Sequence, residues 1–314
     1  MSSSRLGRIN PFEVIGVVDE GENAFYSHLQ FLEEFYRLIL KGINPDSLEL
    51  LNRITQEMYK AKGITARTNL SKLKSTDYPI FDDLFSIVKE RLENEKDDYA
   101  KACLKIIENY VSKFATGGRN SDLWNGNTTF SPRENFIAFD FQRLLANKND
   151  TTANAQMLLV LKWLENEVIK NRDYNTLNGT NKKIVVAIDE AHLFIDEKYP
   201  IALDFMYQLA KRIRKYNGML IIITQNVRDF AGTPEIARKS SAIINVSQYS
   251  LIFSLSPNDM TELCKLYENA GAINEKEKDA IVHNPRGRAF LISSPSKRSN
   301  VDIVATNMTE RMFQ

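Results

Sequence analysis

Apolar residues recur at helical spacing through the first third of the chain. In residues 24–40 the apolar positions lie three and four residues apart, which predicts an amphipathic helix. Asp46 and Glu49 have the three-residue spacing of a capping box and predict the start of a second helix. The same period continues in three segments: 46–59, 81–88 and 99–114. We therefore expect this third of the chain to be all helical.

The pattern changes after residues 116–134, which are rich in Gly, Asn, Ser and Thr and are typical of a loop or boundary. Short apolar runs then alternate with helical stretches. The runs predict strands at 136–141, 184–188, 219–223, 241–246 and 251–255, and a closing hairpin of 289–293 and 301–305 around Pro295-Ser296. The helical stretches are 151–170 with Asp150 as N-cap, 201–216 ended by Asn217-Gly218, a short helix from Pro234, and 257–267.

Two of the predicted strands, 184–188 and 219–223, are apolar throughout. Continuous apolar runs of this length suit strands that are buried on both faces of a parallel sheet. The alternation of strands with helices predicts an α/β fold with a mostly parallel sheet.

Composition narrows the class of protein. The chain has 314 residues, of which 43% are hydrophobic and 26% are charged, and this balance excludes a mostly disordered chain. No apolar run approaches the roughly 18 residues of a membrane span, and the first ten residues have no apolar stretch typical of a signal peptide. The net charge of +1 provides no global basic field, so nucleic-acid binding would need a local patch. The 2 cysteines form no disulfide framework, and the 3 histidines lack metal-ligand spacing.

Two carboxylates, Asp189 and Glu190, directly follow the apolar run 184–188. In open α/β sheets, ligands bind beyond the carboxyl ends of the strands. Hydrolysis of a nucleoside triphosphate uses such a pair: one carboxylate holds the water shell of Mg²⁺ and the other orients and deprotonates the attacking water. The same pair is also compatible with an ordinary turn or helix N-terminus.

Thr224 and Gln225 follow the next apolar run, so they lie beside the carboxylates if the two strands are neighbours. A Gln there can hydrogen-bond a γ-phosphate or its attacking water, or simply cap a turn. The helix between the two runs ends in the basic stretch Lys211-Arg212-Ile213-Arg214-Lys215. These charges complement the helix dipole, or they provide an arginine finger to a neighbouring subunit.

These features, in this order, resemble the motor domain of conjugative-transfer and type IV secretion ATPases of the VirB-four class, in the FtsK/HerA group of RecA-like translocases. The resemblance spans nearly the whole chain. Four stretches resemble family motifs: RINPF at 8–12, the strand 135–141 with Asp140 at its end, the Walker B stretch IVVAIDEAH at 184–192, and RKYNG at 214–218 followed by IIITQ at 221–225. The stretch GRAFL at 287–291 is similar to the closing strand of the family.

The resemblance implies an α/β fold with a RecA-like P-loop NTPase sheet and an inserted all-α subdomain. It implies ATP and Mg²⁺ as cofactors, and Asp189 (through water, on Mg²⁺), Glu190, Gln225 and Arg214 as catalytic residues. Arg214 is preferred over Arg212 as the arginine finger because the finger of the family lies eleven residues before the Gln. Thr224, Arg212 and Arg288 are implied as further nucleotide-binding residues.

One motif of the family is missing from the sequence. No G-x-x-x-x-G-K-[ST] loop occurs, and none of the 13 glycines is followed by Lys. We expect residues 1–20 to begin a truncated RecA-like core, 21–118 to form the helical subdomain, and 119–314 to form the core with Walker B. The chain then resembles the C-terminal portion of such an ATPase, and we expect it to bind ATP poorly by itself.

Three functions follow as hypotheses. The chain is the motor portion of a conjugative or secretion ATPase, a catalytically inactive fragment or subunit that docks onto an intact ATPase or channel protein, or a HerA-type hexameric DNA translocase. The resemblance implies a hexamer, channel-protein partners, and a cytoplasmic location peripheral to the membrane. Scattered basic residues are candidates for nonspecific DNA contacts and equally for solvated surface: Arg228, Arg238, Lys239, Arg286, Arg288, Lys297 and Arg298.

Overall fold

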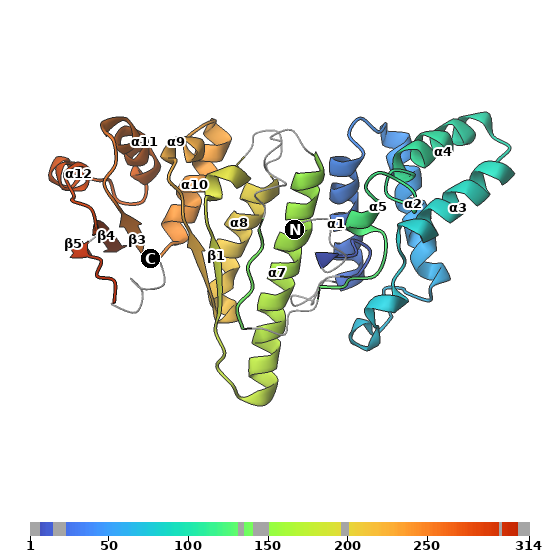
Figure 1. The fold of residues 1–314 in the computed structure, drawn as a ribbon, viewed down its shortest axis with the longest axis horizontal. Helices are drawn as coiled ribbons and strands as arrows, with labels where there is room; N and C mark the ends of the chain where they lie inside the picture. The colour runs from blue at the N-terminus through green and yellow to red at the C-terminus, as the bar shows by residue number, and fades with distance from the viewer. Residues whose placement is uncertain are drawn as a thin grey trace. The chain divides into compact units, whose positions relative to one another are not determined.

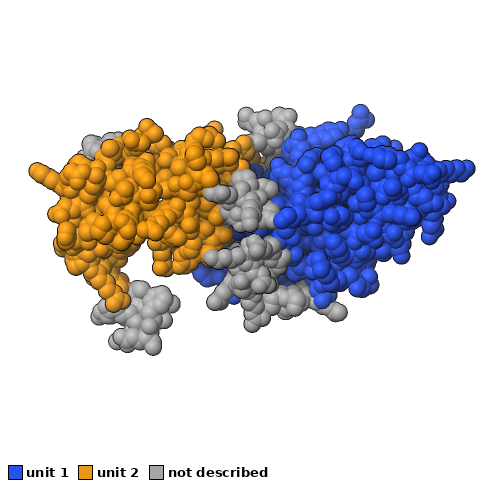
Figure 2. All heavy atoms as spheres, turned by 90° about the horizontal axis from the view of Figure 1, so that it is seen from above, with its two compact units in different colours: residues 1–170 blue, residues 171–314 orange. Residues whose placement is uncertain are grey.

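The structure is a computed structural model that describes residues 7–14, 23–130, 135–140, 151–195, 201–294 and 297–306. The chain divides into two compact units, residues 1–170 and 171–314, which Figure 2 colours separately. The boundary falls within one long helix, α7 (Thr151–Asn178). Each unit is described by itself.

Unit 1 is helical in its described part, as the periodicity predicts (Figure 1). Its helices before α7 are α1 (Ala24–Ile39), α2 (Pro45–Ala61), α3 (Phe81–Asn94), α4 (Asp98–Val111) and the short α5 (Ser121–Trp124), with 3-10 turns η2 (Leu70–Lys72) and η3 (Ser75–Asp77). The predicted capping box of the second helix is wrong. Asn44 is the N-cap, because Pro45 takes the first helical position and the Asn44 side chain accepts a hydrogen bond from the Ser47 N–H.

Aromatic rings form much of the core of unit 1. Phe35 packs edge-on against Trp124, with ring centroids 5.1 Å apart, and Phe12 packs against Phe81 at 4.9 Å. The Phe12 contact ties the RINPF stretch to the start of α3. These rings are fully buried, so the stretch is an integral part of the helical core.

The described residues of unit 2 form two sheets. Strands β1 (Ile184–Ile188) and β2 (Gly218–Ile222) pair in parallel, from Ile184 opposite Gly218 to Ile188 opposite Ile222. Between them lie η4 (Ala191–Phe194), α8 (Ile201–Arg212) and η5 (Ile213–Tyr216). The left-handed residue Asn217 ends η5, so the helical segment ends at the predicted Asn217-Gly218 pair.

The rest of unit 2 forms helices and an antiparallel sheet. The elements are α9 (Val227–Phe230), α10 (Pro234–Val246), β3 (Ser250–Ile252), α11 (Pro257–Tyr267), α12 (Glu275–Val282), β4 (Arg288–Ser294) and β5 (Lys297–Asp302). The sheet has the order β3-β4-β5, and both pairings are antiparallel. The predicted closing hairpin is confirmed as β4 and β5, although β5 begins at Lys297 and Pro295-Ser296 lie outside the described residues.

Two predicted strands are wrong. Residues 241–246 belong to α10, because Thr233 caps the helix, Pro234 starts it, and Ile236, Ser240 and Ile243 bury one helical face. Residues 136–140 form no strand, while Phe141 and Asp150 lie outside the described residues. A short apolar run fits a buried helical turn as well as a strand, and flanking caps decide between them.

The sheet predictions also need correction. Among the described strands only β1 and β2 pair in parallel, and the strands of the other sheet are antiparallel, so the described strands are not mostly parallel. β1 and β2 are not buried on both faces: Val185 is 57% exposed and its register partner Met219 is 52% exposed. One face of this strand pair is therefore open in unit 2, and the opposite face carries the buried Val186 and Ile188.

Candidate functional site

The two parallel strands end at the same edge of their sheet. Asp189 and Glu190 directly follow β1, and Thr224 and Gln225 lie two and three residues after the end of β2. Backbone hydrogen bonds continue past the strands, from Ile223 N–H to the Ile188 carbonyl and from Ala191 N–H to the Ile223 carbonyl, both 2.9 Å. The turn after β1 is thus joined to the end of β2, which places the four polar residues at one edge.

Glu190 and Gln225 are in direct contact at this edge. The Gln225 side chain donates from Nε2 to Glu190 Oε1 at 2.5 Å, across 35 residues of sequence. The second carboxylate oxygen, Oε2, lies 3.2 Å from Nδ1 of His192. The Glu190 backbone N–H donates to Asp189 Oδ1 at 2.9 Å. The predicted neighbourhood of the Asp-Glu and Thr-Gln strand ends is therefore present in the structure.

The backbone of Glu190 is left-handed, with φ 48° and ψ 45°. A residue with a side chain adopts this region at a cost of about 1–3 kcal/mol, and such a conformation persists only where the surroundings hold it. Here the surroundings are the bond from Ala191 N–H to the Ile223 carbonyl and the bond from Leu193 N–H to the Glu190 carbonyl, both 2.9 Å. This conformation turns the chain sharply after β1 and directs the Glu190 side chain toward Gln225.

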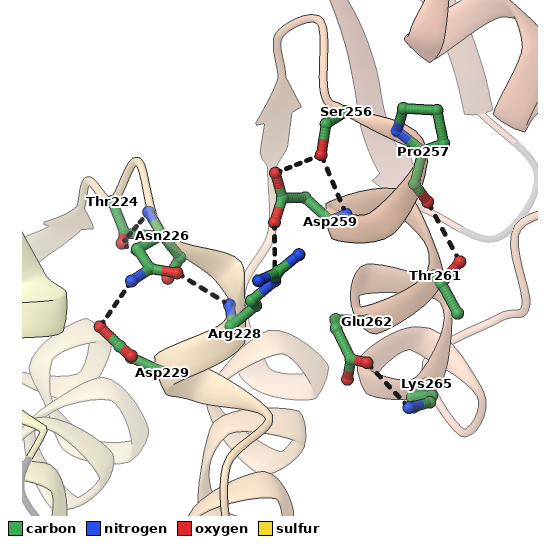
Figure 3. A network of polar contacts seen from close by, with 10 residues as sticks. All are labelled: Thr224, Asn226, Arg228, Asp229, Ser256, Pro257, Asp259, Thr261, Glu262 and Lys265. Atoms are coloured by element: carbon green, nitrogen blue, oxygen red, sulfur yellow. Dashed lines mark hydrogen bonds and ion pairs between the residues drawn. The ribbon is translucent and has the colours of Figure 1, made fainter.

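Thr224 serves the turn that follows β2 (Figure 3). Its hydroxyl accepts a hydrogen bond from the Asn226 N–H at 3.2 Å. The Asn226 side chain in turn accepts from the Arg228 N–H and donates to Asp229. Arg228 Nε lies 3.5 Å from the carboxylate of Asp259 on α11, which links α9 to α11. The Thr224 hydroxyl therefore caps the turn after β2, whereas the turn-capping alternative predicted from the sequence is for Gln225, whose amide contacts Glu190 instead.

The other predicted site residues lie elsewhere. Arg212 ends α8 and Arg214 lies in η5, before the first residue of β2, and both are exposed. They are at the amino end of the parallel pair, and strands of this length span roughly 17 Å. Arg288 lies on β4 in the other sheet, where its Nε is 2.6 Å from Asp302 Oδ1. The structure therefore brings Asp189, Glu190 and Gln225 together and leaves the three arginines apart from them.

Several basic residues considered for DNA contacts have partners within unit 2. Lys239 is only 7% exposed and pairs with Asp204 at 2.7 Å and Glu235 at 2.8 Å. Arg298 pairs with Glu277 at 2.8 Å and donates to two backbone carbonyls, those of Gly271 and Ala272. The charges of Lys239 and Arg298 are thus paired with carboxylates of unit 2, whereas Arg286 and Lys297 are exposed.

The donor set fits part of an Mg²⁺–nucleotide site. Magnesium in phosphoryl-transfer sites is held by one or two carboxylates together with substrate phosphates. Asp189 is an exposed carboxylate at the carboxyl edge of parallel strands, which suits that role. The backbone cradle for phosphates that the family motif would supply has no counterpart in the sequence. The residues present fit the metal-holding and water-orienting half of a site.

Sequence reasoning missed His192. It lies two residues after Glu190, and its place beside the carboxylate follows from the 3-10 turn η4, which folds the chain back onto Glu190. The stretch IVVAIDEAH at 184–192 contains this histidine, but the sequence indicates neither metal-ligand spacing for it nor a contact with Glu190. Asn226, the N-cap of α9, was also missed, although an Asn before a short helix is a capping signal.

Comparisons with known proteins identify the family and the fold of the chain. Residues 64–287 match the TraG P-loop domain. The solved structure of VirB4 of Thermoanaerobacter pseudethanolicus is similar to this chain with 28% identity, covering 98% of this chain and 76% of that chain, at a TM-score of 0.79. A bacterial conjugative coupling protein, TrwBΔN70, is 10% identical with a TM-score of 0.45, over 96% of this chain and 71% of its own.

A curated relative, an uncharacterised protein of Bacillus anthracis, is 22% identical over 94% of this chain and 49% of its own length. The chain thus spans about half the length of the curated relative that it matches.

The predicted fold class, an α/β fold of the RecA-like P-loop NTPase type, is confirmed by the likeness to the VirB4 structure. Within the described part of the chain, no helix combines the length and apolar character that crossing a membrane requires.

Proposed function

The chain belongs to the TraG P-loop domain family, and on that premise we propose that it is the motor portion of a conjugative-transfer or type IV secretion ATPase. The observation that carries the proposal is the hydrogen bond between Glu190 and Gln225 at the carboxyl edge of β1 and β2. A carboxylate beside an amide at this edge is what is needed to orient a water molecule for attack on a γ-phosphate.

Asp189, Glu190 and Gln225 have different roles in this proposal. Asp189 would hold Mg²⁺ through its water shell, and the metal would supply positive charge beside the phosphates. Glu190 orients the attacking water and accepts its proton, because its carboxylate is an acceptor when ionised. Gln225 contacts Glu190 before nucleotide binds and is free to turn its amide toward water or phosphate when that contact opens.

Arg214 serves a neighbouring subunit in this proposal. It lies at the amino end of the strand pair, so it does not reach the carboxylates of its own chain, and it is exposed. A guanidinium keeps its charge and forks toward phosphate oxygens, which suits an arginine finger provided in trans. The proposal therefore includes a closed homo-oligomer, a hexamer by family resemblance, that acts with channel proteins of a conjugation or secretion system at the inner face of the cell membrane.

Mg²⁺-dependent ATP hydrolysis tests the proposal. The purified chain is assayed at millimolar ATP, since we expect weak binding, beside Glu190→Gln, which keeps the shape of the side chain and removes its basicity. We expect hydrolysis that falls roughly a hundredfold or more in the variant. Exposed Glu93→Gln, far from the strand ends in sequence, is the matched control. Hydrolysis that is equal in the wild-type and Glu190→Gln chains would show that Glu190 is not the base.

One observation favours a second candidate function. The sequence contains no G-x-x-x-x-G-K-[ST] loop. A chain that keeps the carboxylate edge without a phosphate cradle can act as a catalytically inactive subunit that docks onto an intact ATPase or a channel protein. No hydrolysis at millimolar ATP, combined with stable association with a complete ATPase of the family, would favour this function over the first.

A further inference from the structure

The carboxylate of Glu190 has a second contact that the proposed function does not use. Gln225 occupies Oε1, and Oε2 faces Nδ1 of His192 at 3.2 Å. Both of these facing atoms are buried and have no hydrogen-bond partner among the described residues, and the 3.2 Å between them is an ion-pair distance without the alignment of a hydrogen bond. A buried polar atom without a partner costs about 1–3 kcal/mol, so two such atoms at this distance are best satisfied by each other.

Pairing these atoms fixes the state of the imidazole. An ionised carboxylate is an acceptor only, so Nδ1 of His192 has to carry the hydrogen in a bond to Oε2. Nδ1 has to carry the hydrogen of this bond whether the imidazole ring is neutral or protonated. Which ring nitrogen carries the hydrogen is set by the partner of the ring, and here the partner is Glu190.

The backbone holds His192 in place for this contact. η4 folds directly after Glu190, and the bonds from Leu193 N–H to the Glu190 carbonyl (2.9 Å) and from Ile195 N–H to the His192 carbonyl (3.1 Å) close its turns. Ala191, between the two side chains, is fully buried. The hydrogen-bonded backbone of this short turn therefore fixes the position from which the His192 imidazole extends.

We propose that His192 is a positioning residue for Glu190, donating from Nδ1 to Oε2 while Gln225 holds Oε1. The role rests on the proposed function of Glu190 as the base. The carboxylate is held from two elements, η4 and the end of β2. When Gln225 turns away toward nucleotide, His192 keeps the remaining oxygen fixed, so that Oε1 is aimed at water and Glu190 does not swing freely.

Two substitutions separate positioning from mere packing. The amide nitrogen of Asn is bonded to Cγ, as Nδ1 of His is, whereas the amide nitrogen of Gln is one atom further out, like Nε2. We expect His192→Asn to keep hydrolysis within about threefold of the wild-type chain and His192→Gln to lower kcat roughly tenfold with KM little changed, which is the effect of one lost charge-assisted bond. Equal losses in both variants would overturn the assignment.

The decisive experiment needs no nucleotide. The chain has 3 histidines, so ¹⁵N-histidine labelling gives ring signals that single substitutions assign. We expect His192 to carry its hydrogen on Nδ1 in the wild-type chain and to change to Nε2–H in Glu190→Ala, with the signals of the buried His28 unchanged as a control of folding. Nε2–H in the wild-type chain, or no change in Glu190→Ala, would overturn the proposal. Absence of hydrolysis in every chain would instead contradict the proposed function, and the ring signals would still decide the role of His192.

Discussion

The side-chain amide of Asn10 donates a hydrogen bond to the backbone carbonyl of Pro79, 2.9 Å away and 69 residues further along the chain. Asn10 is fully buried, and its Oδ1 accepts from the Phe12 N–H at 3.1 Å. Its backbone N–H donates to the hydroxyl of Thr128 at 2.9 Å. One residue of the RINPF stretch therefore joins three separate segments of unit 1, and its amide satisfies the backbone groups of two buried residues.

Asn10→Ala should destabilise unit 1 by about 2–4 kcal/mol, because it leaves the Pro79 carbonyl and the Phe12 N–H buried without partners. Chemical unfolding followed by tryptophan fluorescence measures this, since both tryptophans, Trp124 and Trp163, lie in residues 1–170. Asn94→Ala is the matched control, because Asn94 is exposed and bonds only to Glu90 on its own helix. We expect the control to change the free energy of unfolding by less than about 0.5 kcal/mol.

His28 makes the stability of unit 1 depend on acid. Burial, followed by the positive charge of Lys162, lowers the pKa of His28 to about 3 from its model-compound value of 6.5. Between these values the unfolded chain binds the extra proton, so the free energy of unfolding falls as the pH falls from 6.5 toward 3. At pH 4.5 the loss from this residue should reach about 2–3 kcal/mol relative to pH 7.

Unfolding by urea at pH 7 and pH 4.5 measures this loss. His28→Gln should reduce the difference between the two pH values, because Gln carries no titrating group while its amide can still hydrogen-bond the hydroxyl of Tyr59, which lies 3.2 Å from His28 Nε2 and itself donates to the Phe12 carbonyl. His283→Gln should leave the difference intact, because the His283 side chain is 73% exposed. A pH dependence that is the same in His28→Gln and the wild-type chain would contradict the assignment.

The isolated chain should bind ATP more weakly than at micromolar strength. Phosphate affinity in this fold comes mainly from the Gly-rich loop and its Lys, and no such loop occurs in the sequence. Asp189 and Gln225 add contacts only through the metal, water or γ-phosphate. Titration of MgATP by calorimetry measures the affinity, and a micromolar dissociation constant would reveal a phosphate cradle formed by other residues of the chain.

The carboxylate edge could be predicted because it depends on local order in the sequence. An apolar run followed by Asp189-Glu190 and a second run followed by Gln225 meet whenever two parallel strands are neighbours, and the register of β1 and β2 makes them so. The contact of His192 with Glu190 could not be predicted, because it depends on a left-handed backbone at Glu190 that the residue type disfavours. Residues 241–246 show the other limit, since three consecutive apolar residues fit the last turn of α10 and a strand equally.

Arg214 and Glu190 should complement each other between chains. They lie at opposite ends of the strand pair, so a site that needs both has to take Arg214 from a neighbouring subunit. Arg214→Ala and Glu190→Gln should each lower hydrolysis roughly a hundredfold or more. In a mixture, a Glu190→Gln subunit can lend its Arg214 to the intact Glu190 of an Arg214→Ala neighbour, and a fraction of sites becomes complete.

We therefore expect the mixed chains to hydrolyse ATP faster than either variant alone. The rate per chain should rise with protein concentration, because more chains then assemble. The double variant Arg214→Ala/Glu190→Gln mixed with either single variant is the control, because its subunits lend neither group. Arg212→Ala is the matched control for the choice of finger, since Arg212 is also an exposed arginine, at the end of α8, while Arg214 lies in η5. If Arg214 is the finger, Arg212→Ala should not replace Arg214→Ala in this complementation. Activity in the mixture that merely averages the two single variants would mean that Arg214 acts within its own chain or only stabilises the fold.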